Sequence, residues 1–469
     1  MTERATERPA PAATAEAATA TTGVPPGPEP AAPCAPSAPS ADEVAGICAD
    51  LIRIDTSNAG EGGARGERAA AEHVAALLEE VGVATTLVEA APGRTSVLAR
   101  IAGTDPGHPA FLVHGHLDVV PADPAEWTVP PFSGEVVDGC VWGRGAVDMK
   151  GSVAMTLAVV RRWMREAVRP RGDLVLAFLA DEESTGDFGS RYVVREQREF
   201  FTGCREAISE SGGFSVTAGG GVRVYPVATG ERGTAWMRLT ARGTAGHGSK
   251  PTEDNAVAEL CHALSRLASH RWPVRLTPAV RALLDGLGEA LGTTVDTDRL
   301  DAEAVRLGAV GELFAATVRN SANPTMLQAG YKVNVVPGTA TARVDGRFLP
   351  GTEEEFLATV DRLLGPRVTR EFVNFEQAPS ADASGPTFAA LAEALRAEDP
   401  AGRPVPYVMA GGTDAKSFAR IGIRSFGFAP LLLPPEMDYF GMFHGVDERV
   451  PVEALRFGTR VLDRFLRTR

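Results

Sequence analysis

The chain of 469 residues lacks a disulfide pattern, a membrane-spanning hydrophobic run and an excess of positive charge. Its five cysteines are scattered and form no CxxC pair, which favours a reducing, cytoplasmic compartment. No apolar run reaches the roughly 18 residues that cross a bilayer, and no apolar core of a secretory signal is present. Lys and Arg number 47 against 60 Asp and Glu, so the formal charge is −13. Neither nucleic acid nor an anionic membrane is therefore expected as a partner, because both attract clustered basic residues.

Most of the chain has the composition of a globular protein, with 44% apolar and 23% charged residues. Residues 1–40 differ, because Ala and Pro fill 21 of these 40 positions and Val24 is the only large aliphatic residue. Such a segment cannot bury enough apolar surface to offset the entropy lost on ordering. We therefore predict a disordered tail over 1–40 and folded structure from residue 41 onward.

The folded part contains two kinds of strand pattern. Apolar, strand-like runs alternate with helical periods through most of it, which predicts βαβ units and an α/β fold with a mixed, mostly parallel sheet flanked by helices. Between residues 231 and 380 the strands instead alternate apolar and polar residues, as half-exposed antiparallel strands do. We therefore expect an α+β domain at 231–380, inserted between two parts of one catalytic domain, 41–230 and 381–469.

Residue types that bind metals follow the ends of four apolar strands. In open α/β sheets, ligands bind beyond the carboxyl ends of the strands, so these residues are expected to meet at one edge of the sheet. Two histidines and several acids, without a thiolate, suit zinc or another borderline divalent ion. Together with Asp148, which opens a predicted helix, the residues are His116, Asp118, Glu182, Glu183, Glu210 and His444.

The number of these residues is sufficient for two metal ions. Two cations about 3.5–4 Å apart need a bridging carboxylate, and Asp148 is the candidate. His116 and Glu210 would complete one site, and Glu183 and His444 the other. Each ion would then have three protein ligands and an open position, as catalytic zinc requires.

The neighbouring acids suggest supporting roles. Asp118, two residues after His116, could accept the second ring N–H of that histidine. Because adjacent side chains point to opposite sides of a strand, Glu183 could ligate a metal while Glu182 acts as general base. Each signal is weak alone, since a His-x-Asp pair or an acidic run is commonly a surface feature. Their joint placement after successive strands is what predicts a metal site.

Nine short segments carry a resemblance to a known family. They are LIRIDTSN (51–58), VHGHLDVVP (113–121), WGRGAVDMKG (142–151), ADEESTGDFG (180–189), SESGG (209–213), GTAGHGSKP (243–251), NVVPG (334–338), GGTDAK (411–416) and FHGVDERV (443–450). In this order they resemble the M20 family of di-zinc amidohydrolases and peptidases. That family includes aminoacylase-1, acetylornithine deacetylase, succinyl-diaminopimelate desuccinylase, the glutamate-releasing carboxypeptidases and the carboxypeptidase S group.

The resemblance implies a zinc-exopeptidase-like fold in which the inserted domain is a lid and forms a homodimer. It implies two Zn²⁺ per chain, with Co²⁺ or Mn²⁺ as alternatives, held by the five ligand positions named above. Glu182 matches the family's general acid/base and Asp118 the acid that supports the first histidine. His247 matches a lid histidine that, in many members, polarises the scissile carbonyl in the partner subunit. The positions that match substrate contacts are Asn334, Arg347, Gly412 and Thr413.

We therefore expect a metal-dependent hydrolase that cleaves an amide bond adjacent to a free carboxylate. A metal-bridged water would be activated by Glu182, and the planar fork of Arg347 suits the carboxylate. The GGTDAK and FHGVDERV segments look closer to carboxypeptidase S-like and aminoacylase-like members, which favours an N-acyl amino acid or a short peptide as substrate. Acetylornithine-type or succinyl-diaminopimelate-type substrates are the alternative.

Other classes of protein are less consistent with the sequence. A homologue that binds metal without catalysis stays open, although no ligand or general-base position is substituted. A serine hydrolase would need a G-x-S-x-G elbow, which is absent from the sequence. Neither a Walker A motif nor a Rossmann fingerprint is present, which argues against a nucleotide-dependent enzyme.

Overall fold

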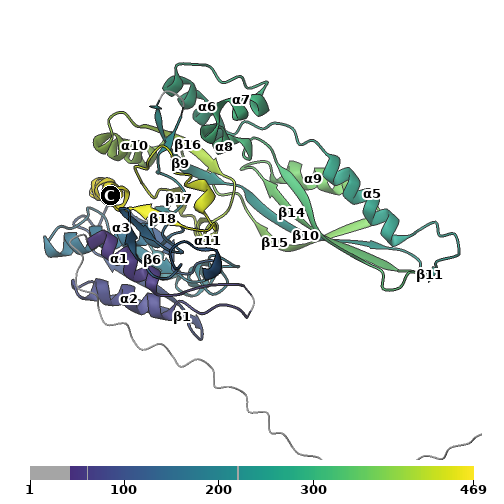
Figure 1. The fold of residues 1–469 in the computed structure, drawn as a ribbon, viewed down its shortest axis with the longest axis horizontal. Coiled ribbons are helices and arrows are strands. Elements are labelled where there is room, and N and C mark those ends of the chain that lie inside the picture. Colours follow the sequence, from purple (N-terminus) through teal and green to yellow (C-terminus); the bar gives the residue numbers. More distant parts are fainter. Residues whose placement is uncertain (1–42, 61, 219–220) are drawn as a thin grey trace, which may run out of the picture. The chain divides into compact units, whose positions relative to one another are not determined.

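The computed structural model describes residues 43–60, 62–218 and 221–469, and its ribbon is drawn in Figure 1. The Ala- and Pro-rich segment 1–40, predicted to be disordered, lies outside the described residues. Among the residues that are described, no helix is both long and apolar enough to cross a membrane.

A nine-stranded sheet forms the centre of the larger part of the structure. Its strands lie in the order β1-β2-β6-β3-β7-β17-β9-β16, with β8 beside β9. The strands are β1 Thr85–Ala91, β2 Arg94–Ile101, β3 Ala110–His116, β6 Leu174–Leu179, β7 Cys204–Ser209, β8 Val216–Thr217, β9 Arg223–Glu231, β16 Arg403–Met409 and β17 Arg424–Gly427. The four neighbours β6, β3, β7 and β17 are parallel, whereas β1, β2 and β8 pair antiparallel. The predicted mixed, mostly parallel sheet is confirmed.

Helices cover both faces of this sheet, which explains why its middle strands are apolar throughout. One face packs against α1 Glu43–Arg53, α2 Arg68–Glu79, α3 Lys150–Arg165, α10 Pro386–Glu398 and α12 Val452–Leu466, and the other against α4 Ser190–Glu196, η2 Arg198–Phe201 and α11 Ala415–Ala419. In β6, successive residues point alternately into the two cores. Leu174, Leu176 and Phe178 belong to the first, and Val175, Ala177 and Leu179 to the second.

A second, four-stranded antiparallel sheet is built from the region that the sequence assigns to the inserted domain. Its order is β12-β14-β10-β15, with β10 Gly233–Arg242, β12 Ser321–Ala329, β14 Thr339–Phe348 and β15 Val368–Glu376. Helices α5 Ala256–Ser269 and α9 Glu353–Leu364 pack with this sheet in a separate hydrophobic core (Figure 1). Every second residue of β14 is buried, as the alternating pattern predicts. The short strands β11 Gly246–His247 and β13 Val335–Val336 pair with each other.

After α5, the three helices that precede β12 in the chain belong to the core of the nine-stranded sheet. They are α6 Pro278–Leu291, α7 Leu300–Leu307 and α8 Ala309–Ala315. Val280, Leu287 and Phe314 are buried in the core of the nine-stranded sheet, where α6 and α8 contact β16. The boundaries 231–380 for a single inserted domain therefore stay a prediction, because part of this segment packs with the central sheet.

The remaining elements lie in the connections near the carboxyl ends of the central strands. They are η1 Pro124–Glu126, β4 Val136–Val137, β5 Cys140–Trp142, η4 Phe440–Met442 and β18 Arg449–Pro451. The strands β18, β5 and β4 form a small antiparallel sheet. This pairing brings a segment near the end of the chain beside residues 140–142.

Candidate metal centre and active site

The candidate ligands converge because β6, β3 and β7 are adjacent and parallel. His116 is the last residue of β3, and Glu210 directly follows β7. Glu182 and Glu183 follow β6 after a short turn in which Asp181 has a left-handed backbone, with φ of +66°. The carboxyl ends of parallel neighbours lie at the same edge of a sheet, so these side chains meet there.

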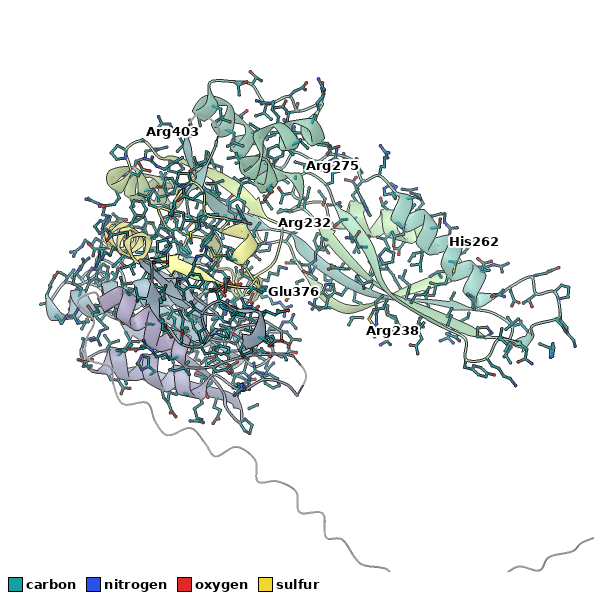
Figure 2. The ribbon with its side chains drawn as sticks, in the orientation of Figure 1. Arg232, Arg238, His262, Arg275, Glu376 and Arg403 are labelled. Atoms are coloured by element: carbon teal, nitrogen blue, oxygen red, sulfur yellow. The ribbon has the colours of Figure 1, made fainter. Side chains whose placement is uncertain are left out.

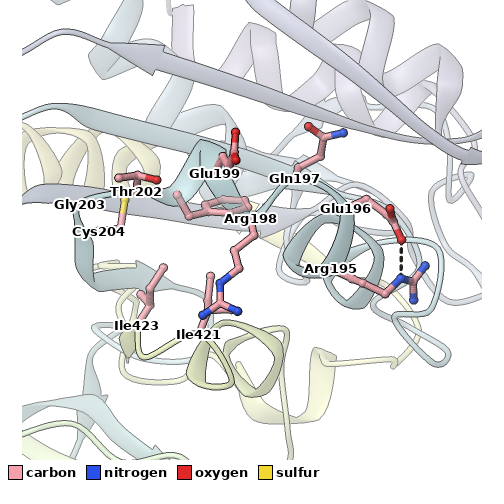
Figure 3. Close-up of a pocket in the computed structure, with 11 residues that line it drawn as sticks. Arg195, Glu196, Gln197, Arg198, Glu199, Thr202, Gly203, Cys204, Ile421 and Ile423 are labelled. Atoms are coloured by element: carbon pink, nitrogen blue, oxygen red, sulfur yellow. Dashed lines mark hydrogen bonds and ion pairs between the residues drawn. The ribbon is translucent and has the colours of Figure 1, made fainter.

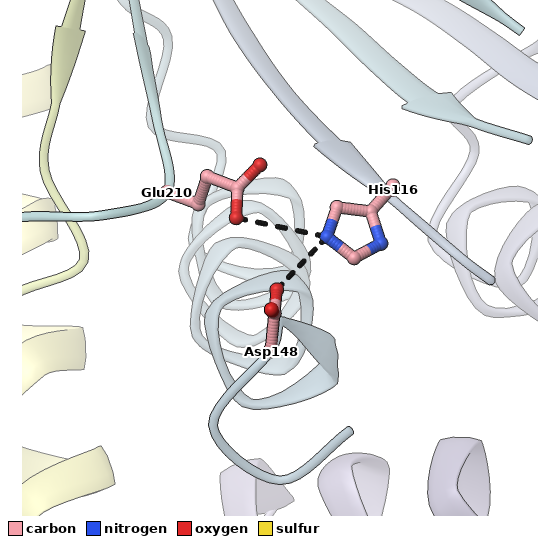
Figure 4. A group of neighbouring side chains, drawn as sticks. All are labelled: His116, Asp148 and Glu210. Atoms are coloured by element: carbon pink, nitrogen blue, oxygen red, sulfur yellow. Dashed lines mark hydrogen bonds and ion pairs between the residues drawn. The ribbon is translucent and has the colours of Figure 1, made fainter. Parts of the chain in front are cut away.

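His116, Asp148 and Glu210 form the first group of candidate ligands, and all three are buried (Figure 4). His116 Nε2 lies 3.0 Å from Asp148 Oδ1 and 3.6 Å from Glu210 Oε2. Burial alone would lower the pKa of His116, but the carboxylates of Glu210 and Asp148 raise it well above its usual value. The three side chains thus present one ring nitrogen and two carboxylates to a common point.

Asp148, Glu183 and His444 form the second group. His444 Nε2 lies 3.0 Å from Glu183 Oε2 and 3.3 Å from Asp148 Oδ2. Asp148 therefore turns one oxygen toward each group, which is the geometry that a bridging ligand needs. The side chain of His444 is 55% exposed, so this group is open to solvent on one side.

The donor set fits a pair of divalent cations of the zinc type. Each group offers one imidazole and two carboxylate donors, which are ligand types that zinc accepts. Burial raises the pKa of Glu210 to about 8, with His116 opposing the rise and Asp148 adding to it. Oε1 of Glu183 is buried without a hydrogen-bond partner. A cation between these acids would satisfy their lone pairs and offset the repulsion between their charges.

Glu182 lies beside the two groups and has a different environment. Burial, followed by the charge of Glu210, raises its pKa well above the usual carboxyl value. Its backbone N–H donates to Asp118 Oδ1 at 3.1 Å, and that of Glu183 donates to Asp118 Oδ2 at the same distance. One carboxylate thus fixes the turn that carries both acids.

The histidine hydrogen bond of Asp118 differs from the sequence-based expectation. His116 Nδ1 lies 2.9 Å from the backbone carbonyl of Asp118 and 3.7 Å from its carboxylate Oδ1. The ring nitrogen therefore pairs with the main chain, while the carboxylate holds the 182–183 turn. The contribution of the Asp118 side chain to catalysis stays a prediction.

A buried polar network behind Asp118 was not anticipated from sequence. Asn58 Nδ2 donates to Asp118 Oδ2 at 2.8 Å and to Asp181 Oδ1 at 3.1 Å. Arg94 donates to the same Asp181 oxygen at 2.8 Å and pairs with the fully buried Glu67. Asn58 and Asp181 lie inside the segments 51–58 and 180–189, so those segments contained a usable signal. Arg94 and Glu67 had none.

Three of the four expected substrate contacts lie near one another. Arg347 donates to Asp345 at 2.7 Å and to Thr234 Oγ1 at 3.2 Å, and Lys416 Nζ donates to that same hydroxyl at 2.8 Å. Thr413 Oγ1 donates to Glu231 Oε1 at 2.5 Å. Gly412 lies against the ammonium of Lys416, where a Cβ atom would come within 2.2 Å of Nζ.

This polar cluster joins the two sheets. Glu376, at the end of β15 (Figure 2), accepts a hydrogen bond from Arg191 of α4 at 2.6 Å. Its other oxygen lies 3.6 Å from Lys416 Nζ. Arg347 and the 412–413 loop therefore lie where the four-stranded sheet is tied to the nine-stranded one.

The structure does not bring His247 and Asn334 to this cluster. His247 pairs with Val335 and is exposed, and Gly248 N donates to Asn334 O at 2.9 Å, so the two residues are neighbours. Arg242 and Thr339 are paired at one end of β10 and β14, and His247 and Asn334 lie in the segments just beyond that end. Thr234 and Arg347 are paired at the other end. Eight residues of antiparallel strand at about 3.4 Å each separate these ends by roughly 27 Å.

Figure 3 shows the residues that line a surface pocket of about 650 Å³. It is lined by Arg195, Arg198, Cys204 and Ile423 among others, at the start of β7. Glu210 follows the opposite end of that strand. This pocket is therefore separate from the metal groups and shares no residue with them.

The fold first defines the class of protein. The structure is similar to a solved M20 family metallo-carboxypeptidase from Sulfolobus solfataricus, with a TM-score of 0.66 and 18% identity over 91% of this chain and 99% of that chain. This similarity identifies the architecture as that of the M20 peptidases, in agreement with the strand order and flanking helices described above.

The sequence comparisons then give the family. Residues 112–468 match Peptidase family M20/M25/M40, and the chain belongs to that family. Aminoacylase-1 of Sus scrofa is 29% identical over 387 residues, 80% of this chain and 84% of the relative. N-fatty-acyl-amino acid synthase/hydrolase PM20D1 of Xenopus tropicalis is 29% identical over 401 residues, 82% of this chain and 77% of the relative. The predicted family is thus confirmed, and the chain is a hydrolytic enzyme of the M20 type.

Proposed function

We propose that this protein hydrolyses an amide bond adjacent to a free carboxylate, in an N-acyl amino acid or a short peptide. The main support for the proposal is that Asp148 belongs to both ligand groups and so joins them, with Glu182 beside them. The names of the two relatives, an aminoacylase and an N-fatty-acyl-amino acid synthase/hydrolase, support this substrate class.

The metal centre would be held by five residues of this chain. His116 and Glu210 would bind one ion, Glu183 and His444 the other, and Asp148 would bind both. Two Zn²⁺ ions are proposed, with Co²⁺ or Mn²⁺ as alternatives, since the donor set suits each of them. When bound, such ions polarise a carbonyl oxygen and make a water molecule more acidic.

Glu182 would move the proton. Burial raises its pKa, which increases the proton affinity of its carboxylate, as a general base requires. It would accept a proton from the attacking water at a side-chain oxygen and then give that proton to the leaving amine. The two backbone hydrogen bonds to Asp118 would keep this carboxyl group in place during the transfer.

The substrate carboxylate would be bound where the two sheets are tied together. Arg347 supplies a planar fork of N–H donors. It shares the Thr234 hydroxyl with Lys416, whose ammonium lies against Gly412, the residue before Thr413. Catalytic His247 and substrate-binding Asn334 would come from a second subunit, because they lie at the far end of β10 and β14. We therefore propose a homodimer formed through the four-stranded sheet and its helices.

The proposed function also includes a reducing, cytoplasmic compartment. Cys48, Cys140, Cys204 and Cys261 are all free thiols in the described part of the chain. Free thiols are typical of a reducing, cytoplasmic environment. We propose that the enzyme acts there on small molecules, with neither nucleic acid nor membrane as partner.

Amine release from a panel of N-acyl amino acids and dipeptides tests the proposed reaction. Each compound is compared with its C-terminally amidated analogue, with zinc supplied and Glu182→Gln as control. The proposal expects release from the free-carboxylate compounds only. Metal binding with no hydrolysis of any compound would instead favour a homologue that has lost catalysis.

A further inference from the structure

We infer that Glu448 is the residue that positions Asp148, and that both metal ions depend on it. The inference rests on the metal centre of the proposed function. Glu448 lies four residues after His444 and directly before β18, and it is completely buried. The pairing of Trp142 with Arg449 between β5 and β18 places Glu448 beside the loop that leads to Asp148.

The carboxylate of Glu448 accepts hydrogen bonds from several residues of that loop. Its Oε1 accepts the backbone N–H groups of Val147 at 2.6 Å and Asp148 at 2.9 Å. Its Oε2 accepts the N–H of Gly145 at 3.0 Å and Nη1 of Arg144 at 2.9 Å. Four donors thus converge on two oxygens, which is the full capacity of an ionised carboxylate.

The same contacts join the two segments that carry Asp148 and His444. Arg144 Nη2 donates to the backbone carbonyl of His444 at 3.4 Å, and Gly143 N donates to the carbonyl of Glu448 at 2.9 Å. The 143–148 loop and the 444–448 segment are therefore held together from both sides. A shift of the loop would move Asp148 relative to His444 and to the other ligands.

The arrangement requires a carboxylate rather than any polar residue. In Glu448→Gln one acceptor oxygen becomes an NH₂ group, which would face N–H donors and leave two of them without a partner. The backbone of Asp148, or that of Gly145, would then have to move to find another acceptor. Because Asp148 contributes an oxygen to each ligand group, we expect both ions to be affected.

Zinc affinity of the full-length chain tests the inference. Competition with a chromogenic chelator gives the affinity, and elemental analysis after dialysis gives the number of ions bound. Glu448→Gln is expected to bind both ions about 10–100-fold more weakly, the usual effect of losing a group that orients a ligand. Thermal unfolding of the metal-free proteins measures any loss of stability separately.

Asp399→Asn is the matched control. Asp399 is also a buried acid that pairs with an arginine, Arg223, but it lies among β9, β16 and α10 and contacts none of the candidate ligands. This variant is expected to lose stability and keep the zinc affinity of the wild type. If it loses zinc to the same degree, general destabilisation explains both variants and the inference is overturned.

The remaining outcomes separate the inference from the proposed function. Wild-type zinc affinity in Glu448→Gln would overturn the inference and leave the proposed metal centre intact. A wild-type protein that binds no metal would overturn the metal centre itself. If Glu448→Gln does not fold, Arg144→Lys provides the second test, because a lysine has one nitrogen in place of the two, Nη1 and Nη2, that bond Glu448 and the His444 carbonyl. Unchanged zinc affinity in Arg144→Lys would then overturn the inference.

Discussion

Glu182 and Glu183 are adjacent in the sequence, yet the structure gives their side chains different surroundings. Glu183 points at His444, whereas no side chain in the described part of the chain forms a hydrogen bond with the carboxyl group of Glu182. Asp118 holds the backbone of both residues and so fixes this difference. The proposed function assigns metal binding to Glu183 and proton transfer to Glu182, so it places the two roles within a single turn.

Glu182→Gln is expected to keep its metal and lose turnover. The amide has nearly the shape of the carboxyl group, but it cannot accept the proton of the attacking water. Loss of a general base lowers kcat by about 10²- to 10⁴-fold. Steady-state kinetics and metal analysis of the same preparation check both parts. A variant with near-normal kcat would exclude Glu182 as the base.

Arg347→Met is expected to impair recognition of the substrate carboxylate. Hydrogen bonds to charged groups contribute about 1.5–3 kcal/mol, so KM for a free-carboxylate substrate should rise by roughly 10- to 150-fold. Arg347→Lys should show a smaller rise, since it keeps the charge and loses the fork. Equal KM values for wild type and Arg347→Met would place the carboxylate elsewhere.

His444 comes long after β17, but most of the candidate ligands could be predicted from sequence because they end or closely follow an apolar strand. His116, Glu183 and Glu210 are examples, and their convergence depends only on neighbouring parallel strands. The partners of Asp118 could not be predicted in the same way. Whether its carboxylate faces a ring nitrogen or the next turn depends on side-chain directions that no local pattern records.

At the scale of secondary structure, the burial of β6 on both faces follows from its continuous apolar run, and the half-buried β14 follows from its alternating pattern. The packing of α6 and α8 does not. Their apolar faces would suit either sheet, and only the tertiary structure selects the core beside β16. The apolar pattern of a helix predicts which of its faces is buried, but not which element that face packs against.

The connection between α10 and β16 contains a pH-sensitive contact. Hydrogen bonds from Arg223 hold the pKa of Asp399 below its usual value, and burial opposes them. A depressed folded pKa means that the ionised acid stabilises the fold above the unfolded pKa, near 3.9, and that this stabilisation is lost as the pH falls further. No sequence pattern indicates this pair.

Asp399→Asn is therefore expected to be less stable than the wild type by about 1–3 kcal/mol at pH 7. The difference should shrink as the pH falls below about 4, because the unfolded wild type binds a proton at Asp399 there, and it should vanish once the folded protein also protonates, below its own depressed pKa. Urea unfolding at pH 7, 4.5 and 3.5 measures the difference. A gap that stays constant over this range would contradict the assignment.

At the scale of the whole molecule, the four-stranded sheet separates two sets of proposed substrate contacts. Arg347 lies at one end of β14, and His247 follows the far end of β10, roughly 27 Å away at about 3.4 Å per residue. A complete site with both residues therefore needs two chains under the proposed function.

Mixing two inactive variants tests this arrangement. In a heterodimer of Glu182→Gln with His247→Ala, one site has an intact Glu182 and receives an intact His247 from its partner. Random reassociation of equal amounts should restore about a quarter of the sites, because half of the dimers are mixed and each has one good site. Activity no higher than the sum of the separate variants would show that His247 acts within its own chain.

Under the proposed function, the span of β10 and β14 also has a kinetic consequence. A centre completed by a second chain is present only in the associated fraction of the protein, which mass action controls. In dilute solution the initial rate should rise with the square of protein concentration, and it should become linear once association is complete. The abundance of the enzyme would then set its specific activity as well as its amount.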